Sequence, residues 1–150
     1  MIAIDRGDPR DPGTLALLQA SHAMMQELFA PDETHVLSVE QLCDEDVRFF
    51  TARRGAQVTG CAALALRDGY GEIKSMFVAP EARGTGTADA LMRMLEDEAH
   101  AAGLPWLRLE AGDLLHAAHR LYTRHGFAPC DPFGDDAASG SSVFMKKRLD

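Results

Sequence analysis

The residues best suited to bind an anion lie in one short turn, APEARGTGTA, at residues 79–88. The turn follows a strand-like segment, EIKSMFV, and precedes a helix-like segment, DALMRMLEDEAHAAG. A glycine-rich turn that leads into a helix leaves backbone N–H groups without partners, beside the positive end of the helix dipole. Such an arrangement suits a phosphate or a diphosphate.

Individual side chains in this turn support an anion site. Arg83 adds a full positive charge at the mouth of the turn. Gly84 and Gly86 lack a Cβ atom, so the backbone can take positive φ values and approach a ligand closely. Thr85 and Thr87 offer hydroxyl donors.

The turn differs from two other phosphate-binding loops. The nucleoside triphosphate loop requires GxxxxGK[ST], and no lysine follows Gly86. The dinucleotide fingerprint requires GxGxxG, whereas here the two glycines are followed by Ala88 and Asp89.

The spacing R-x-x-G-x-A, from Arg83 to Ala88, resembles the acetyl-coenzyme A loop of the GCN5-related N-acetyltransferases, the GNAT family. The strand that ends at residues 76–80 precedes the loop, as in that family. A second segment, LYTRHGF at residues 121–127, matches the family pattern LY-x-x-x-GF. The two motifs occur in the family's order with a strand pattern between them, and the resemblance covers nearly the whole chain.

The resemblance implies how acetyl-CoA would be held. Main-chain amides from Arg83 to Ala88 would surround its diphosphate, and the backbone of Met76 to Val78 would pair with its pantetheine arm. This second contact is an addition to a sheet edge, so the following strand must splay away. A backbone N–H near Phe77 or Val78 would stabilise the oxyanion that forms during transfer.

One position departs from the family pattern. The family often carries Asn or Gln seven residues before its tyrosine, where the amide meets the pantetheine arm, and here that position is Leu115. His116 is the candidate substitute. The cofactor-binding residues implied by the resemblance are Met76, Phe77, Val78, Arg83, Gly84, Thr85, Gly86, Thr87, Ala88 and His116.

Transfer of an acyl group from a thioester to an amine needs a proton donor for the thiolate and a neutral amine. Tyr122 occupies the family's tyrosine position, four residues before Gly126, and its phenol would donate that proton; the alternative is a packed aromatic side chain. Glu72 and Glu110, at a strand start and a strand end, are the candidates for the base. Many members of the family are thought to use water chains instead, so a reaction with no dedicated base stays open.

The remaining pattern predicts elements that would position these residues. Strands are expected at residues 1–5, 47–54, 57–67, 70–78, 106–110, 127–130 and 142–148, and helices at 14–29, 38–43, 89–103 and 113–125. This order predicts one α+β, GNAT-like domain over residues 1–150. Its mixed, mostly antiparallel sheet would have about seven strands and about four flanking helices, with a splay between the fourth and fifth strands.

Three local features are also expected. Gly60 would mark a bulge or a close backbone approach. Ser38 and Gln41 have the spacing of a capping box. Asp113 would cap the last helix, with the apolar side chains of Leu114 and Ala117 among those facing inward.

Composition restricts the function classes. The formal net charge of −8 disfavours nucleic acid as a partner. It agrees with a cationic amine substrate, although acidic charge also serves solubility. No apolar run reaches the roughly 20 residues that cross a bilayer, so no membrane partner is expected. The three cysteines are widely spaced and no secretion signal is visible, which indicates a cytoplasmic protein with reduced thiols and no metal.

The sequence thus predicts an acetyl-CoA-dependent N-acetyltransferase that acts on a primary amine of a small molecule or peptide, by direct attack in a ternary complex. Two alternatives stay open: a non-catalytic acyl-CoA-binding sensor of the same fold, and transfer of a longer acyl chain. Edge strands near the C-terminus also leave a homodimer open.

Overall fold

The computed structural model describes residues 1–29, 37–133 and 142–149. The strands are β1 (Ala3–Arg6), β2 (Val47–Arg54), β3 (Gln57–Leu66), β4 (Gly71–Val78), β5 (Trp106–Gly112), β6 (Ala128–Pro129) and β7 (Ser142–Arg148). The helices are α1 (Pro12–Leu28), α2 (Val39–Leu42), α3 (Thr87–Ala101) and α4 (His116–Arg124), with a short 3-10 helix, η2 (Pro80–Ala82). The described residues therefore form the α+β domain that the sequence predicts.

The strands make a seven-stranded sheet in the order β1-β2-β3-β4-β5-β7-β6. The first four strands form an antiparallel meander, and β5, β7 and β6 form a second antiparallel group. The parallel pair β4–β5 joins the two groups. This arrangement confirms the predicted mixed, mostly antiparallel sheet.

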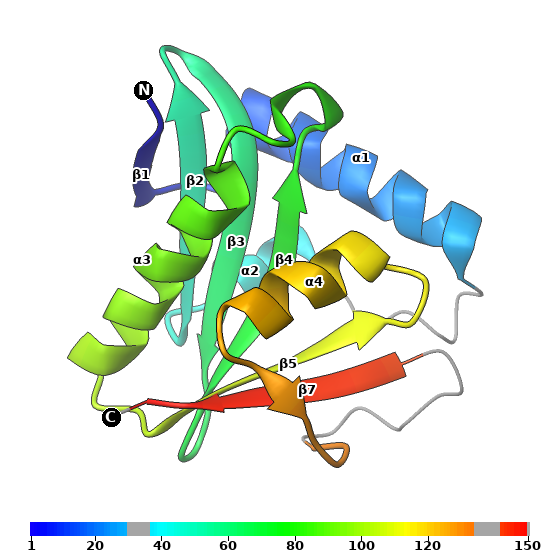
Figure 1. The fold of residues 1–150 in the computed structure, drawn as a ribbon. Coiled ribbons are helices and arrows are strands. Elements are labelled where there is room, and N and C mark those ends of the chain that lie inside the picture. The colour runs from blue at the N-terminus through cyan, green and yellow to red at the C-terminus, as the bar shows by residue number, and fades with distance from the viewer. Residues whose placement is uncertain (30–36, 134–141, 150) are drawn as a thin grey trace.

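The parallel pair β4–β5 is short and then opens. Pairing runs from Gly71, opposite Leu107, to Ile73, opposite Leu109, and stops there. Beyond this point the two strands diverge, and α4 lies in front of the opening (Figure 1). The predicted splay between the fourth and fifth strands is confirmed.

A bulge in β4 lies where the opening begins. Cys61 and Ala63 of β3 are opposite Phe77 and Lys74, so β4 carries one more residue than β3 over this interval. Ser75 lies in the interval with φ 56°, a left-handed conformation that is uncommon for a residue with a Cβ atom. A bulge bends its own strand and interrupts pairing, which agrees with the departure of β4 from β5 at this point.

Helices cover both faces of the sheet, and each face has its own core. On one face, the predicted apolar stripe of α3 is buried, with Leu91 and Leu95 fully excluded from solvent and packed among residues of β2, β3 and β5. On the other face, Leu17 of α1 and Leu42 of α2 pack with Phe77 of β4 and neighbouring strand residues. Burial of each leucine contributes about 1.5–3 kcal/mol, so the two layers fix the sheet firmly on both sides of the opening.

Of the two predicted helix N-caps, one is confirmed and one is wrong. The capping box of α2 is confirmed, because the Ser38 side chain accepts from the Gln41 amide while the Gln41 side chain accepts from the Ser38 amide. The predicted cap of α4 is wrong. That helix begins at His116 with Leu115 as its N-cap and no side-chain cap bond, so Asp113 lies outside it.

The inward face of α4 is also shorter than predicted. Leu114 precedes the helix and is 50% exposed, and Ala117 is exposed as well. Leu121 and Tyr122 are buried as predicted. The strand β5 runs on to Gly112, two residues past its predicted end, and the later helix start shifts the apolar stripe toward the C-terminal half of α4.

Gly60 in β3 is confirmed as a site of close approach and of irregular pairing. The register between β2 and β3 shifts beside it, since Ala52 is opposite Gly60 while Arg53 is opposite Val58. A Cβ atom at Gly60 would lie 3.1 Å from Cγ2 of Thr87, the first residue of α3. The missing side chain therefore lets the start of α3 pack directly on the sheet.

We expect Gly60→Val to lower the free energy of unfolding by about 1–3 kcal/mol, because the added methyl groups displace the start of α3 from β3. Urea denaturation measures the change. Gln57→Val, at the exposed end of the same strand, is the control and should leave the midpoint nearly unchanged. An unaltered midpoint for Gly60→Val would contradict this account of the packing.

Candidate coenzyme and acyl-transfer site

The turn that precedes α3 has free backbone donors. Gly86 is the N-cap of α3 with φ 86°, and Gly84 has φ 78°, so both glycines take the left-handed conformation that a side chain would oppose. The amides of residues 84–88 make no hydrogen bond to any residue that the structure describes. These donors lie at the positive end of a helix of 15 residues, which is an arrangement that suits an anion.

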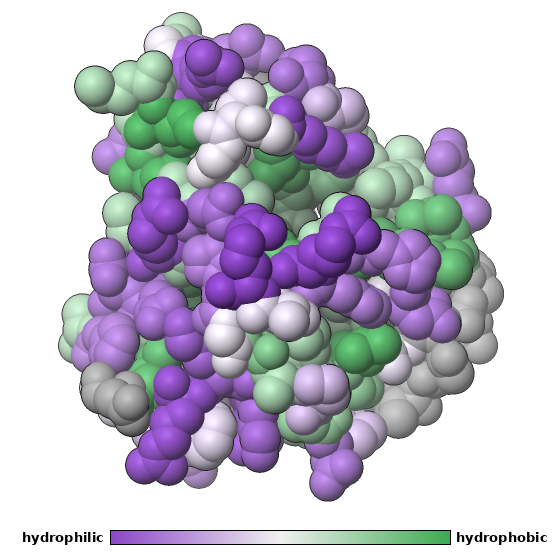
Figure 2. Space-filling model, in the orientation of Figure 1, coloured by the Kyte–Doolittle hydropathy of each residue, from purple (hydrophilic) through white to green (hydrophobic). Residues whose placement is uncertain are grey.

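A cavity of about 170 Å³ adjoins this turn. It is lined by Val78, Ala82, Arg83, Gly84, Gly86, Thr87, Ala88, Asp89 and Arg124. Figure 2 shows the corresponding surface, with a hollow between the turn and α4. The Arg83 guanidinium lies 5.7 Å from the centre of the Phe77 ring, and its Nε donates to the Val78 carbonyl oxygen at 3.3 Å.

The threonine hydroxyls of the turn have contacts within the protein. Thr85 Oγ1 donates to the Ala82 carbonyl oxygen at 2.5 Å and lies 2.8 Å from Thr87 Oγ1. Thr87 is only 1% exposed. The hydroxyls therefore hold the turn in shape, and what these two residues offer a ligand is their amides.

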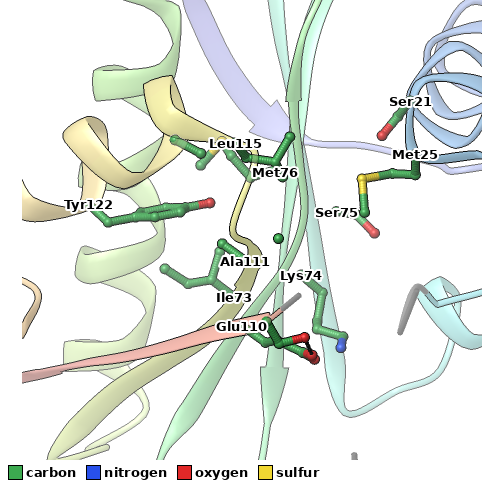
Figure 3. Close-up of a pocket in the computed structure, with 13 residues that line it drawn as sticks. Ser21, Met25, Ile73, Lys74, Ser75, Met76, Glu110, Ala111, Leu115 and Tyr122 are labelled. Carbon is green, nitrogen blue, oxygen red and sulfur yellow. Dashed lines mark hydrogen bonds between the residues drawn. The ribbon is translucent and has the colours of Figure 1, made fainter. Parts of the chain in front are cut away.

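A second cavity, of about 120 Å³, lies in the opening between β4 and β5 under α4 (Figure 3). Its lining comes from α1, β4, β5, α4 and the start of β7. The lining residues are Ser21, Met25, Ile73, Lys74, Ser75, Met76, Glu110, Ala111, Gly112, Leu115, Ala118, Tyr122 and Ser142. The splay thus brings together segments that are about 120 residues apart, from Ser21 to Ser142.

Tyr122 enters this cavity from α4. Its side chain is 6% exposed, its ring packs edge-on to Phe127 at 5.9 Å between centroids, and its hydroxyl points into the opening (Figure 3). Burial raises the pKa of the Tyr122 phenol well above its ordinary value, so the hydroxyl keeps its proton across the physiological pH range. The cavity therefore contains the hydroxyl of Tyr122 in its protonated form, and the role of this hydroxyl as proton donor stays a prediction.

The two candidate carboxylates are in different environments. Glu110 lines the cavity, and its Oε2 accepts a hydrogen bond from the Ser142 hydroxyl at 2.5 Å. Glu72 is 5% exposed and forms ion pairs with Arg67 Nε at 3.1 Å and Lys74 Nζ at 3.3 Å. Glu72 is absent from the described lining of this cavity, so of the two candidates for the base only Glu110 lines it.

The helix that carries the tyrosine presents Leu115 to the cavity, while His116 is exposed. The His116 ring lies 6.3 Å from the His119 ring, and His119 Nε2 lies 2.8 Å from the Gly112 carbonyl oxygen. His116 therefore does not line the described cavity where the family's amide is expected. The contact proposed for it stays a prediction.

A third cavity, of about 290 Å³, lies between α1, α2 and β4. It is lined by Leu18, Ser21, His22, Leu37, Ser38, Val39, Glu40, Leu42 and Ser75. Ser21 and Ser75 also line the second cavity, so the two spaces meet at these residues. The described lining contains no lysine or arginine.

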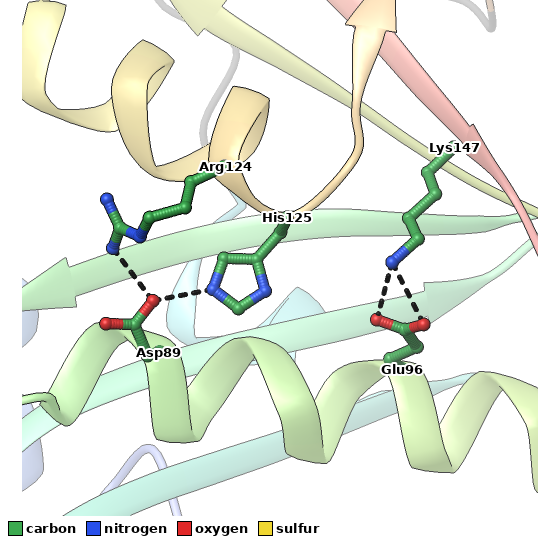
Figure 4. A network of polar contacts seen from close by, with 5 residues as sticks. All are labelled: Asp89, Glu96, Arg124, His125 and Lys147. Carbon is green, nitrogen blue, oxygen red and sulfur yellow. Dashed lines mark hydrogen bonds and ion pairs between the residues drawn. The ribbon is translucent and has the colours of Figure 1, made fainter.

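Polar pairs tie α3 to the end of α4 and to β7, and sequence reasoning missed them. Asp89 Oδ1 accepts from Arg124 Nη2 at 2.8 Å and lies 2.6 Å from His125 Nε2 (Figure 4). The hydrogen bonds from Arg124 and His125 lower the pKa of the Asp89 carboxyl. About two turns further along α3, Glu96 accepts from Lys147 Nζ at 3.0 Å. Asp89 and Arg124 are 35 residues apart, so no local pattern could reveal their contact.

Other kinds of site find little support in the described residues. They contain no group of three or more His, Cys, Asp and Glu side chains suited to a metal ion. Cys43, Cys61 and Cys130 are free thiols, and burial raises the pKa of Cys61 to about 12. None of the described helices has the length and apolar content needed to cross a membrane.

Comparison with known proteins agrees with the fold and with this geometry. Residues 16–127 match the profile of the Acetyltransferase (GNAT) family. The chain is 38% identical to an IAA acetyltransferase from Azospirillum brasilense, over 99% of this chain and 98% of the relative. It is 34% identical to an uncharacterized N-acetyltransferase, YedL, from Escherichia coli, over 99% and 96% of the two chains. The chain therefore belongs to the GNAT family and is an acyltransferase.

Solved structures give the same fold. A candidate acyl-CoA N-acyltransferase from Klebsiella pneumoniae superposes with a TM-score of 0.87 at 32% identity, over 99% of this chain and 98% of the other. A PaiA N-acetyltransferase from Thermoplasma acidophilum, solved in complex with coenzyme A, superposes with a TM-score of 0.79 at 19% identity, over 99% of each chain. At that identity the second likeness shows the fold alone.

The Asp89 contacts predict a pH-dependent stability. A carboxyl whose folded pKa is lowered stabilises the protein fully above its unfolded pKa, about 4, and this contribution is lost as the pH falls through the folded value. We expect Asp89→Asn to lower the free energy of unfolding by about 1 kcal/mol at pH 7, a modest effect because the pair is partly exposed. The difference from the wild type should shrink as the pH falls below about 4.

Denaturation at several pH values measures this difference. Asp97→Asn, an exposed position on the same helix, is the control and should show little change at any pH. A deficit for Asp89→Asn that stayed constant down to the lowest pH would argue against an ionised Asp89 as its cause.

Proposed function

We propose that this protein transfers an acetyl group from acetyl-CoA to a primary amine of a small molecule or peptide, by direct attack in a ternary complex. The observation that carries the proposal is the junction of two features at the end of β4. The free amides of residues 84–88 can hold a diphosphate beside Val78, and Met76, two residues earlier on β4, lines the cavity that contains Tyr122. We also propose that residues 1–150 form one N-acetyltransferase domain.

The coenzyme would be held by main-chain groups. The amides of residues 84–88 would bind its diphosphate, with Arg83 and the dipole of α3 adding positive charge. The backbone of Met76 to Val78 would pair with the amides of its pantetheine arm, because β5 has left this edge of β4. A thioester bound in this way would reach the cavity that Tyr122 lines.

The acetyl group would pass directly from the thioester sulfur to the amine nitrogen. The neutral amine attacks the carbonyl carbon, so that a C–N bond forms and the C–S bond breaks. A backbone N–H near Phe77 or Val78 would stabilise the negative charge that develops on the oxygen. Tyr122 would give its proton to the departing sulfur, and the amine proton would pass to a base or to water.

The acceptor would enter from the side of α1 and α2. The 290 Å³ cavity there meets the cavity of Tyr122 at Ser21 and Ser75, so an amine bound in it would face the thioester. Four aliphatic side chains line this space beside Glu40 and His22, and the described lining includes no lysine or arginine. These surroundings favour an amine with an apolar body. The N-acetyltransferase relative from Escherichia coli supports a nitrogen acceptor.

We expect Tyr122→Phe to lower turnover by about 100-fold while leaving the affinity for acetyl-CoA nearly unchanged, because only the proton donor is lost. Release of free thiol in the presence of an amine panel measures turnover, and calorimetry measures binding. Tyr70→Phe is the matched control, since Tyr70 is the other of the two tyrosines and packs against Phe133 away from this cavity. Full activity in Tyr122→Phe would remove Tyr122 from the mechanism.

Glu110 is favoured over Glu72 as the base, because Glu110 lines the cavity and Glu72 is held by two cations. We expect Glu110→Gln to lower kcat/KM for the amine by about 100-fold in a protein of normal stability. We expect Glu72→Gln instead to lower the free energy of unfolding by about 3 kcal/mol, since it breaks a buried ion pair. If Glu110→Gln kept the wild-type rate at every pH, water would be the base.

The same thiol assay separates transfer from sensing. Binding of acetyl-CoA without thiol release across a broad amine panel would favour the acyl-CoA sensor. Faster release of thiol from a longer acyl-CoA than from acetyl-CoA would show that the longer acyl-CoA is the preferred donor in the same type of reaction. Because the cavity that Tyr122 lines is only about 120 Å³, we expect the acetyl donor to be preferred.

A further inference from the structure

Arg124 lies at the cavity of about 170 Å³ beside the glycine turn, which is called the phosphate cavity because the diphosphate is proposed to bind there. It is the last residue of α4, and its side chain is 57% exposed. Arg124 lines the same 170 Å³ cavity as Arg83, Gly84 and residues 86–88. In sequence it lies far from the turn, and neither the anion-loop pattern nor the tyrosine motif assigns it a ligand.

Three formally charged side chains line this cavity among the described residues: Arg83, Asp89 and Arg124. Asp89 is the third residue of α3, so its carboxylate competes with any bound phosphate for the same helix dipole. Its lowered pKa keeps it charged at neutral pH. A negative charge beside an anion site weakens anion binding by repulsion, so the presence of Asp89 here calls for another role.

The contacts of Asp89 indicate that it holds the Arg124 side chain in place. Its Oδ1 accepts from Arg124 Nη2 at 2.8 Å and meets His125 Nε2 at 2.6 Å, while the His125 side chain is 14% exposed (Figure 4). Arginine has five N–H donors in a planar fork, and Nη2 alone has a hydrogen-bond partner in the described part of the chain. Asp89 therefore fixes one edge of the guanidinium and leaves donors for a second anion.

We infer that Arg124 binds a phosphate of the coenzyme, with Asp89 and His125 as positioning residues that hold its guanidinium at the rim of the cavity. This inference rests on the proposed function, because acetyl-CoA supplies the phosphate. A guanidinium can bind a phosphate through two N–H groups at once, which a lysine ammonium cannot match. The diphosphate and the 3′-phosphate of coenzyme A share this chemistry.

Calorimetric titration with coenzyme A tests the role of Arg124. We expect Arg124→Gln to weaken binding by about tenfold, the effect of one partly exposed charge-assisted contact. Arg120→Gln, one turn earlier on α4 at an exposed position outside the cavity lining, is the matched control and should bind like the wild type. Equal affinities for the two variants would overturn the inference.

Titration with 3′-dephospho-coenzyme A identifies the phosphate. If Arg124 contacts the diphosphate, Arg124→Gln weakens both ligands equally. If it contacts the 3′-phosphate, the loss is confined to coenzyme A. A wild-type protein that bound neither ligand would overturn the proposed function together with this inference, whereas binding that ignores Arg124 overturns the inference alone.

The role of Asp89 is tested with a double-mutant cycle, in which the two single variants and the double variant are compared. If Asp89 positions Arg124, Asp89→Asn weakens binding by about threefold in the wild-type background, although it removes a repulsive charge. In the Arg124→Gln background only the repulsion is left, so the same change leaves affinity equal or higher. Tighter binding by Asp89→Asn in the wild-type background would exclude a positioning role.

Discussion

The site depends on the point at which β4 stops pairing with β5. The pair holds from Gly71 to Ile73, and beyond that residue no strand among the described residues pairs with this edge of β4. An unpaired strand edge inside a domain is normally unfavourable, since its N–H and C=O groups need partners. Here the edge is kept open by packing, because α1 and α3 hold β4 from its two faces while β5 follows β7 away from it.

The bulge at Ser75 lies at the point where β4 and β5 separate. One extra residue in β4 bends the strand where it leaves β5; beyond the bulge Met76 packs on the side of α3, while Val78 contacts the cores of both faces. Phe77, between them, packs into the core on the other face. The side chain of Phe77 therefore anchors the strand, while its backbone remains part of the edge that is proposed to meet the coenzyme.

Charge around the phosphate cavity is balanced by contacts between distant segments. The protein carries a net charge of −8, yet two arginines reach this cavity, one from the turn and one from the end of α4. Asp89 bonds to the second of them and so couples the start of α3 to the end of α4. The helix proposed to bind the phosphates and the helix that carries Tyr122 are thereby joined by an interaction between Asp89 and Arg124.

The sequence by itself determined the strand and helix order, the glycine turn, the tyrosine motif and the capping box at Ser38, because each of these depends on residues within a few positions of one another. It misjudged the start of α4, where Asp113 looked like a cap but β5 continues to Gly112 through pairing with β7. Only the tertiary structure decided that Glu110 faces the cavity while Glu72 is held by Arg67 and Lys74, and that Asp89 meets Arg124. Those outcomes depend on which strand faces which helix, and that is fixed by packing across the whole sheet.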